Sequence, residues 1–135
     1  MKIGYNWSKV DKGDIISFQY RGTNKKLLRR TILVLEKNLK GMLHGIVLEL
    51  SNRIIGSQVK EILEIAGKTK AVDSKKKVYR VELDGESKDV YKRLKDLIKR
   101  YGVYRTFKYE KARKSQVFLE DLTLPASFIK ELNED

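Results

Sequence analysis

The alternation of hydrophobic and polar residues predicts that the chain is organised around one β-hairpin. Two apolar strands, Leu28–Glu36 and Met42–Leu50, flank a short basic turn at Lys37–Gly41. Ile32–Leu35 is continuously apolar, which is typical of a strand covered on both faces. Gly45 interrupts the second strand and indicates a bulge or a close approach of two backbones. We therefore expect the neighbouring segments to pack on both sides of this hairpin.

The segment before the hairpin predicts another strand and a pair of capping aromatic residues. Ile15–Tyr20 alternates with the period of a half-buried strand, between a turn at Lys12–Asp14 and a loop at Arg21–Lys26. Tyr5 and Trp7 precede this strand. Large aromatic side chains mostly fill cores, so we expect these two to cap the core rather than to anchor a partner.

Two amphipathic helices are predicted after the hairpin. The first begins at Ser51 or Ser57 and ends at Gly67, a typical helix stop. The second follows a turn and cap at Asp84–Ser87 and ends at Gly102. Its predicted buried face consists of Val90, Tyr91, Leu94, Leu97, Ile98 and Tyr101. Its other face carries Lys88, Lys92, Arg93, Lys95, Lys99 and Arg100.

The remaining segments predict a loop, three strands and a short terminal helix. Lys68–Lys77 contains five lysines and one aspartate, and we expect it to be a mobile loop. Strands are predicted at Lys77–Asp84, Val103–Tyr109 and Gln116–Leu122. Pro125 breaks the last strand, and the residues from Ala126 to Leu132 predict a short helix.

This order of elements predicts an α+β fold: a small, bent antiparallel sheet closing toward an SH3-like barrel, with two helices packed on it. The 135 residues contain no internal repeat and no low-complexity linker. We therefore expect residues 1–135 to form a single domain.

The amino-acid composition limits the kinds of partner, catalysis and metal site that we expect for this protein. The net charge of +12 favours contact with a polyanion, and the excess of Lys over Arg fits backbone neutralisation better than base reading. The absence of cysteine excludes disulfides and thiol catalysis, and the single histidine excludes a His-rich metal site. We expect no cofactor. No secretory pattern and no apolar run of about 18 residues is present, so we expect no membrane contact and a location in a host cytoplasm or a virion.

The most basic region, Lys88–Lys114, is the candidate partner site. It holds eleven basic and three acidic residues, interleaved with Tyr101, Tyr104, Phe107 and Tyr109. Single-stranded nucleic acid is often held by basic grooves with aromatic platforms. The alternative is a solvated or protein-facing basic surface beside a strand whose aromatic residues belong to the core. The candidate residues are Lys92, Arg93, Lys99, Arg100, Tyr104, Arg105, Lys108, Arg113 and Lys114, with Lys75, Lys76 and Lys77 as a flexible arm.

Catalysis has weaker support in the sequence. No phosphate-binding loop, dinucleotide fingerprint or nucleophile elbow is present. His44 could act as a general base, but it lacks an obvious partner nearby in the sequence. We therefore interpret His44 as a structural or surface residue.

Two segments resemble a known family. Lys12–Phe18, followed by Arg29–Leu35, is similar to the start of the MazF/PemK toxins, in which a Gly-Asp-apolar strand precedes an arginine and another apolar strand. The resemblance implies an SH3-like barrel of five or six strands. It also implies an RNA cleft near Arg29 or Arg30.

Members of that family cleave RNA with an arginine and a Thr or Ser on the next barrel strands. Arg30 would take the first role and Ser51 the second. The chain departs from the family pattern because Thr31 replaces the usual proline and the Thr-Ser pair is missing. An endoribonuclease is therefore the alternative hypothesis.

A second resemblance covers Arg30–Leu48, Tyr104–Thr106 and a closing strand. These segments look like small uncharacterised proteins of tailed bacteriophages. The resemblance implies a phage origin and assigns no residue a role. We expect a non-enzymatic accessory protein that holds DNA, RNA or an acidic protein surface, and oligomers are possible. A purely structural virion component would instead dock its acidic end, Glu131–Asp135, on a neighbour.

Overall fold

The sheet and helices are seen in a computed structural model, which describes residues 3–21, 27–37, 42–48, 56–73, 78–101, 104–108 and 115–119. The strands are β1 (Ile3–Tyr5), β2 (Ile15–Arg21), β3 (Leu27–Lys37), β4 (Met42–Val47), β5 (Gly67–Asp73), β6 (Val78–Leu83), β7 (Tyr104–Lys108) and β8 (Val117–Leu119). The helices are a 3₁₀ turn at Trp7–Lys9, α1 (Gly56–Ala66) and α2 (Ser87–Tyr101). The predicted terminal helix lies outside the described residues.

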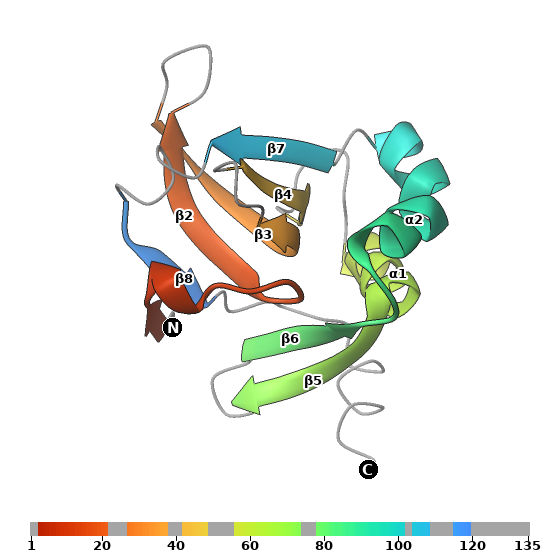
Figure 1. Ribbon diagram of the computed structural model, residues 1–135, viewed down its shortest axis with the longest axis horizontal. Helices are drawn as coiled ribbons and strands as arrows, with labels where there is room; N and C mark the ends of the chain where they lie inside the picture. The colour runs from red at the N-terminus through yellow and green to blue at the C-terminus, as the bar shows by residue number, and fades with distance from the viewer. Residues whose placement is uncertain are drawn as a thin grey trace.

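The strands form two antiparallel sheets. The larger has the order β1-β8-β2-β3-β4-β7, and β5 pairs with β6 in a separate hairpin. Figure 1 shows both helices on one side of the large sheet, with the hairpin of β5 and β6 below it. The mixed fold, the antiparallel sheet and the two helices are as predicted. Closure into an SH3-like barrel is not confirmed, because β1 and β7 are the two ends of an unclosed sheet.

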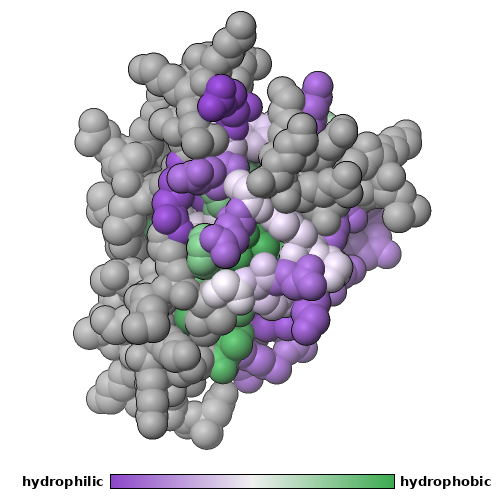
Figure 2. Space-filling model, turned by 90° about the vertical axis from the view of Figure 1, so that its left-hand side faces the viewer, coloured by the Kyte–Doolittle hydropathy of each residue, from purple (hydrophilic) through white to green (hydrophobic). Residues whose placement is uncertain are grey.

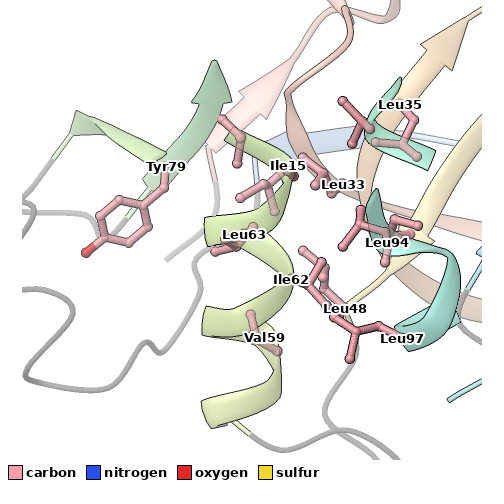
Figure 3. Packing of buried hydrophobic residues seen from close by; sticks show 14 residues of the cluster. Ile15, Leu33, Leu35, Leu48, Val59, Ile62, Leu63, Tyr79, Leu94 and Leu97 are labelled. Carbon is pink, nitrogen blue, oxygen red and sulfur yellow. The ribbon is translucent and has the colours of Figure 1, made fainter. Parts of the chain in front are cut away.

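Strand β3 carries a core on each of its faces, as its continuous apolar run predicts. Leu33 and Leu35 face the first core, and Ile32 and Val34 face the second. In the first core, α1 and α2 pack on the sheet, and Figure 3 shows side chains of both helices converging with those of the strands. All four β3 residues are at most 2% exposed. This central hairpin is therefore buried from both sides.

The second core is rich in aromatic rings. Phe18 makes edge-on contacts with Trp7, at 5.4 Å between centroids, and with Phe107, at 5.5 Å. The indole Nε1 of Trp7 donates a hydrogen bond to the carbonyl oxygen of Ser115 at 2.7 Å. Tyr5 and Trp7 both pack against this core, which confirms their predicted capping role.

Gly45 marks a close backbone approach, as predicted. A Cβ at this position would lie 2.8 Å from Cδ1 of Ile32 and 2.9 Å from the carbonyl oxygen of Leu33. The neighbouring strand shifts register between Val34 and Glu36, so a bulge lies on β3, opposite the glycine. Any larger residue at Gly45 would push β3 and β4 apart.

The predicted mobile loop at Lys68–Lys77 is wrong for its first half. Gly67–Asp73 forms β5, which is paired with β6 from Gly67 opposite Leu83 to Asp73 opposite Val78. Lysines alternate with the buried Thr69, so the basic residues occupy only the outer side of a real strand. Gly67 permits the pairing, because a Cβ there would lie 2.1 Å from the carbonyl oxygen of Glu82.

A turn before β2 joins the hairpin of β5 and β6 to the large sheet. The Gly13 N–H donates to the carbonyl of Val34 at 2.7 Å, and the Gly13 carbonyl accepts from the Val81 N–H at 2.8 Å. Gly13 has φ +93°, and a Cβ there would lie 2.1 Å from the Val81 carbonyl oxygen. The predicted turn at Lys12–Asp14 therefore connects β3 with β6.

Candidate functional site

Helix α2 presents the candidate basic surface and is anchored at its first turn. The Glu86 N–H donates to the Asp89 carboxylate at 3.1 Å, which satisfies one of the open donors at the helix start. The Ser87 hydroxyl donates to the carbonyl of Leu35 on β3. Val90 and Leu94 are fully buried in the first core. The opposite side of the helix therefore faces away from the sheet.

Four lysines form a line along that outer side, which we call the lysine row: Lys88, Lys92, Lys95 and Lys99. Their spacing of four, three and four residues places each next to the following one on a helix surface. All four are exposed. Lys88 lies 3.6 Å from Glu86, whereas Lys92, Lys95 and Lys99 make no hydrogen bond or ion pair that the described part of the chain records. Three of the four ammonium groups therefore carry a charge that no described neighbour neutralises.

The arginines near this surface are used differently. Arg93 donates from Nε to the carbonyl of Ile65 at 3.2 Å and from Nη2 to the carbonyl of Asp84. It therefore ties α2 to the end of α1 and to the turn after β6. Arg100 is exposed next to the last residue of the helix, about two turns after Arg93 and on the same side.

Strand β7 contains the other candidate residues that the structure describes: Tyr104, Arg105 and Lys108. It begins next to the end of α2 and runs toward the tip of β2 (Figure 1). Lys108, its last residue, is exposed, and its N–H donates to the Tyr20 hydroxyl at 3.2 Å. Tyr104 and Arg105 are described only as backbone in register with β4. Lys108 and the lysine row are therefore at opposite ends of β7.

The other predicted site residues lie outside the described part of the chain. They are Lys75, Lys76, Lys77, Arg113 and Lys114. The structure thus brings Lys92 and Lys99 together with Lys88 and Lys95, which were assigned to the same helix face but not to the predicted site. It separates Lys108 from them and places the Arg93 guanidinium on backbone carbonyls.

Two further arginines are bound to the protein itself. Arg80 pairs with the buried carboxylate of Asp14 at 3.0 Å. Arg29 donates to the Ser17 hydroxyl at 2.8 Å and lies over the ring of Phe118, 5.9 Å from its centroid. Figure 2, viewed toward the side where β8 and β2 lie, shows a small apolar area bordered by hydrophilic side chains. The Arg29 contacts stabilise the sheet, and the Arg80–Asp14 ion pair stabilises the turn before β2.

Arg30, the arginine that the toxin resemblance favours, is half-buried. It lies opposite Phe18 in the pairing of β2 and β3, on the sheet face that carries the second core. Ser51 lies outside the described residues.

A cavity of about 430 Å³ lies on the outer side of β6. Its lining combines cations and carboxylates: Asp11, Lys12, Lys70, Arg80, Val81, Glu82, Leu83 and Gly85. Lys70 contacts Glu82 in an ion pair and lowers the pKa of that carboxyl. Lys70 is paired with Glu82, and Arg80 with the buried Asp14 outside the lining, so two of the three cations that line the cavity are already held by the protein.

The buried Asp14 has a structural role. Its Oδ2 accepts from the Asp11 N–H at 2.9 Å, and Oδ1 contacts Arg80. Burial raises the pKa of the Asp14 carboxyl, and the bond from Asp11 and the charge of Arg80 oppose that rise. The burial of Tyr5 and, after it, the negative charge of Asp14 raise the pKa of the Tyr5 hydroxyl. Both carboxylate oxygens are thus occupied by the fold.

His44 lies on β4 and is half-buried. Its Nδ1 is 3.1 Å from the Thr106 hydroxyl on β7, and its backbone is in register with Glu36. This cross-strand contact fits the structural interpretation of the histidine. Among the described residues, no three His, Asp or Glu side chains gather as metal ligands would.

Comparison with known proteins gave no matching family model, no similar curated protein and no similar solved structure. Among the helices that the structure describes, none combines the length and the apolar character needed to cross a membrane. Because these comparisons found no relative, the role of the lysine row is inferred from its geometry and charge.

Proposed function

We propose that the protein is a non-enzymatic basic accessory protein of a phage that holds DNA or an acidic protein surface. It would act in the virion or on the phage nucleic acid. The lysine row supports this proposal, because three exposed ammonium groups in one line are not neutralised by described neighbours. The phage origin is supported by the resemblance of Arg30–Leu48 to small tailed-phage proteins.

The row suits a partner recognised by charge rather than by base sequence. Lysine presents a compact point charge, whereas the planar fork of arginine pairs with guanine edges. Arg29, Arg80 and Arg93 are bonded within the protein, and the lysines face the solvent. The available cations are thus suited to phosphate or carboxylate groups in a row.

The SH3-like barrel is part of the same proposal. The bend of the large sheet around the second core supports it (Figure 1). Folds of this size serve many functions, so this assignment adds nothing to the case for a particular partner.

A salt titration tests the proposal. Binding of duplex DNA should weaken roughly a hundredfold between about 50 and 200 mM salt, as expected for about four phosphate contacts. The double variant Lys92→Glu with Lys99→Glu should lose most of this binding. A matched control, Lys9→Glu with Lys12→Glu, changes the net charge equally at exposed residues outside α2 and should bind almost normally. A flat salt response contradicts polyanion binding, and equal losses in both variants contradict the location.

A further inference from the structure

Asp96 is an exposed acidic residue at the edge of the lysine row. It follows Lys92 by four residues and precedes Lys99 by three, and residues at these spacings are neighbours on a helix surface. Its side chain makes no hydrogen bond or ion pair that the described part of the chain records. A carboxylate that no described residue engages therefore lies beside two lysines of the row, with about 5–6 Å between Cβ atoms.

Asp96 and Asp89 form a negative border along one side of the row. They are seven residues apart, about two helical turns, so they lie on one line parallel to the lysines. The Asp89 carboxylate accepts from the Glu86 N–H at 3.1 Å, which accounts for an acidic residue at the start of the helix. Asp96 lies beside the second half of the row, where no contact among the described residues accounts for it.

This side of α2 suits a nucleic-acid duplex better than a protein or a single strand. The residues of the row and of its border are all charged, whereas protein interfaces usually have an apolar centre. Tyr91, the exposed aromatic residue beside the row, already interacts within the protein. Single strands are commonly held by aromatic platforms as well as by charge, but a duplex keeps its bases inside and presents a dense line of phosphates.

We propose that the lysine row binds one line of phosphates on duplex DNA and that Asp96 limits the strength of this contact. The inference rests on the proposed polyanion binding and names duplex DNA as the partner. Phosphates held by Lys92 and Lys99 come close to the Asp96 carboxylate, and like charges repel. The contact therefore stays weak and reversible. It is also independent of base sequence, because lysine reads phosphate charge rather than base edges.

The test measures how the full chain binds a duplex of about 20 base pairs, an oligothymidine of equal length and polyglutamate, at about 50 mM salt. Asp96→Asn removes the carboxylate charge and should tighten duplex binding by between about threefold and tenfold, a gain that shrinks as salt screens the charges. Asp96→Ala should behave in the same way. Glu61→Gln is the matched control, since it removes one negative charge at an exposed residue of α1 and should change binding little. Thermal melting of the three variants checks that the fold is kept.

Each contrary outcome identifies which proposal fails. Unchanged or weaker duplex binding in a folded Asp96→Asn protein overturns the role of Asp96 and leaves polyanion binding intact. An equal gain in Glu61→Gln does the same, because it assigns the effect to net charge. Oligothymidine or polyglutamate binding as tight as that of the duplex overturns the choice of partner. No binding of any of the three ligands at low salt overturns the proposed function as well.

Discussion

At the scale of single residues, the turn before β2 has the strictest requirements. Gly13 and Asp14 together contact β3 and β6, and each has a property that few other residues supply. Gly13 adopts a positive φ against a carbonyl, and Asp14 buries a carboxylate between Arg80 and a backbone N–H.

Asp14→Asn should change how stability depends on pH. Because the folded-state pKa of Asp14 is raised by burial, the folded protein binds more protons than the unfolded chain between the ordinary and the raised pKa. Wild-type stability should therefore fall, relative to the variant, as the pH rises from the ordinary aspartate pKa of about 3.9. Urea unfolding of both proteins at several pH values measures the difference. If the unfolding free energy of the wild type instead increases relative to that of the variant as the pH rises, the Arg80 ion pair outweighs the effect of burial.

Gly13→Ala should destabilise the protein by roughly 1–3 kcal/mol or more, because the new Cβ meets the Val81 carbonyl at a strained φ. Gly4→Ala is the matched control, since nothing lies within 4 Å of a Cβ at that exposed position. Denaturant midpoints compare the two substitutions. Equal small effects would contradict the close contact between this turn and β6.

At the scale of elements, Arg93 joins three segments that the sequence separates. Arg93→Ala should cost about 1 kcal/mol by removing bonds to the carbonyls of Ile65 and Asp84. Amide hydrogen exchange should rise in β5 and β6 more than in β2 and β3. Lys92→Ala, on the same helix without such bonds, should leave exchange unchanged; similar profiles for the two variants would remove this role of Arg93.

The elements also show what sequence periodicity can predict. The bounds of α2 follow from its apolar spacing, and the buried hairpin follows from Ile32–Leu35, because both patterns report local packing directly. β5 was missed because its exposed lysines resemble a loop, and its pairing depends on Gly67 meeting Glu82. The sequence pattern of this segment therefore did not distinguish a strand with outward lysines from a basic loop.

The sequence likewise predicted one part of the candidate site and missed another. Lys92 and Lys99 lie where helical spacing places them. The bonding of Arg93 to two turn carbonyls could not be predicted, since the acceptors belong to backbone far away in sequence. Tyr91 was assigned to the buried face, but it lies at the edge of that face and stays partly exposed.

At the scale of the whole molecule, the two cores share the strands β2 and β3. Neighbouring residues alternate between them, with Ile15 in one and Ile16 in the other. Loss of packing in either core should therefore destabilise both sides of the sheet.

Leu94→Ala in the first core and Phe18→Ala in the second should each cost about 2–5 kcal/mol. Trp7, the single tryptophan, reports on the second core, and helical circular dichroism reports on the first. We expect each variant to shift both signals to the same lower midpoint. A Leu94→Ala protein that loses helix signal while Trp7 emission stays native would show that the cores unfold independently.

The pairing of β1 with β8 has a consequence for synthesis on the ribosome. Among the described strands, β8 is the hydrogen-bonding neighbour of β1, and it also borders β2. β1, which precedes the other described strands in the chain, therefore waits for residues 117–119 to emerge before its ladder can form. Nascent chains can assemble the β2–β4 meander early, but the sheet is completed only after translation has passed Leu119.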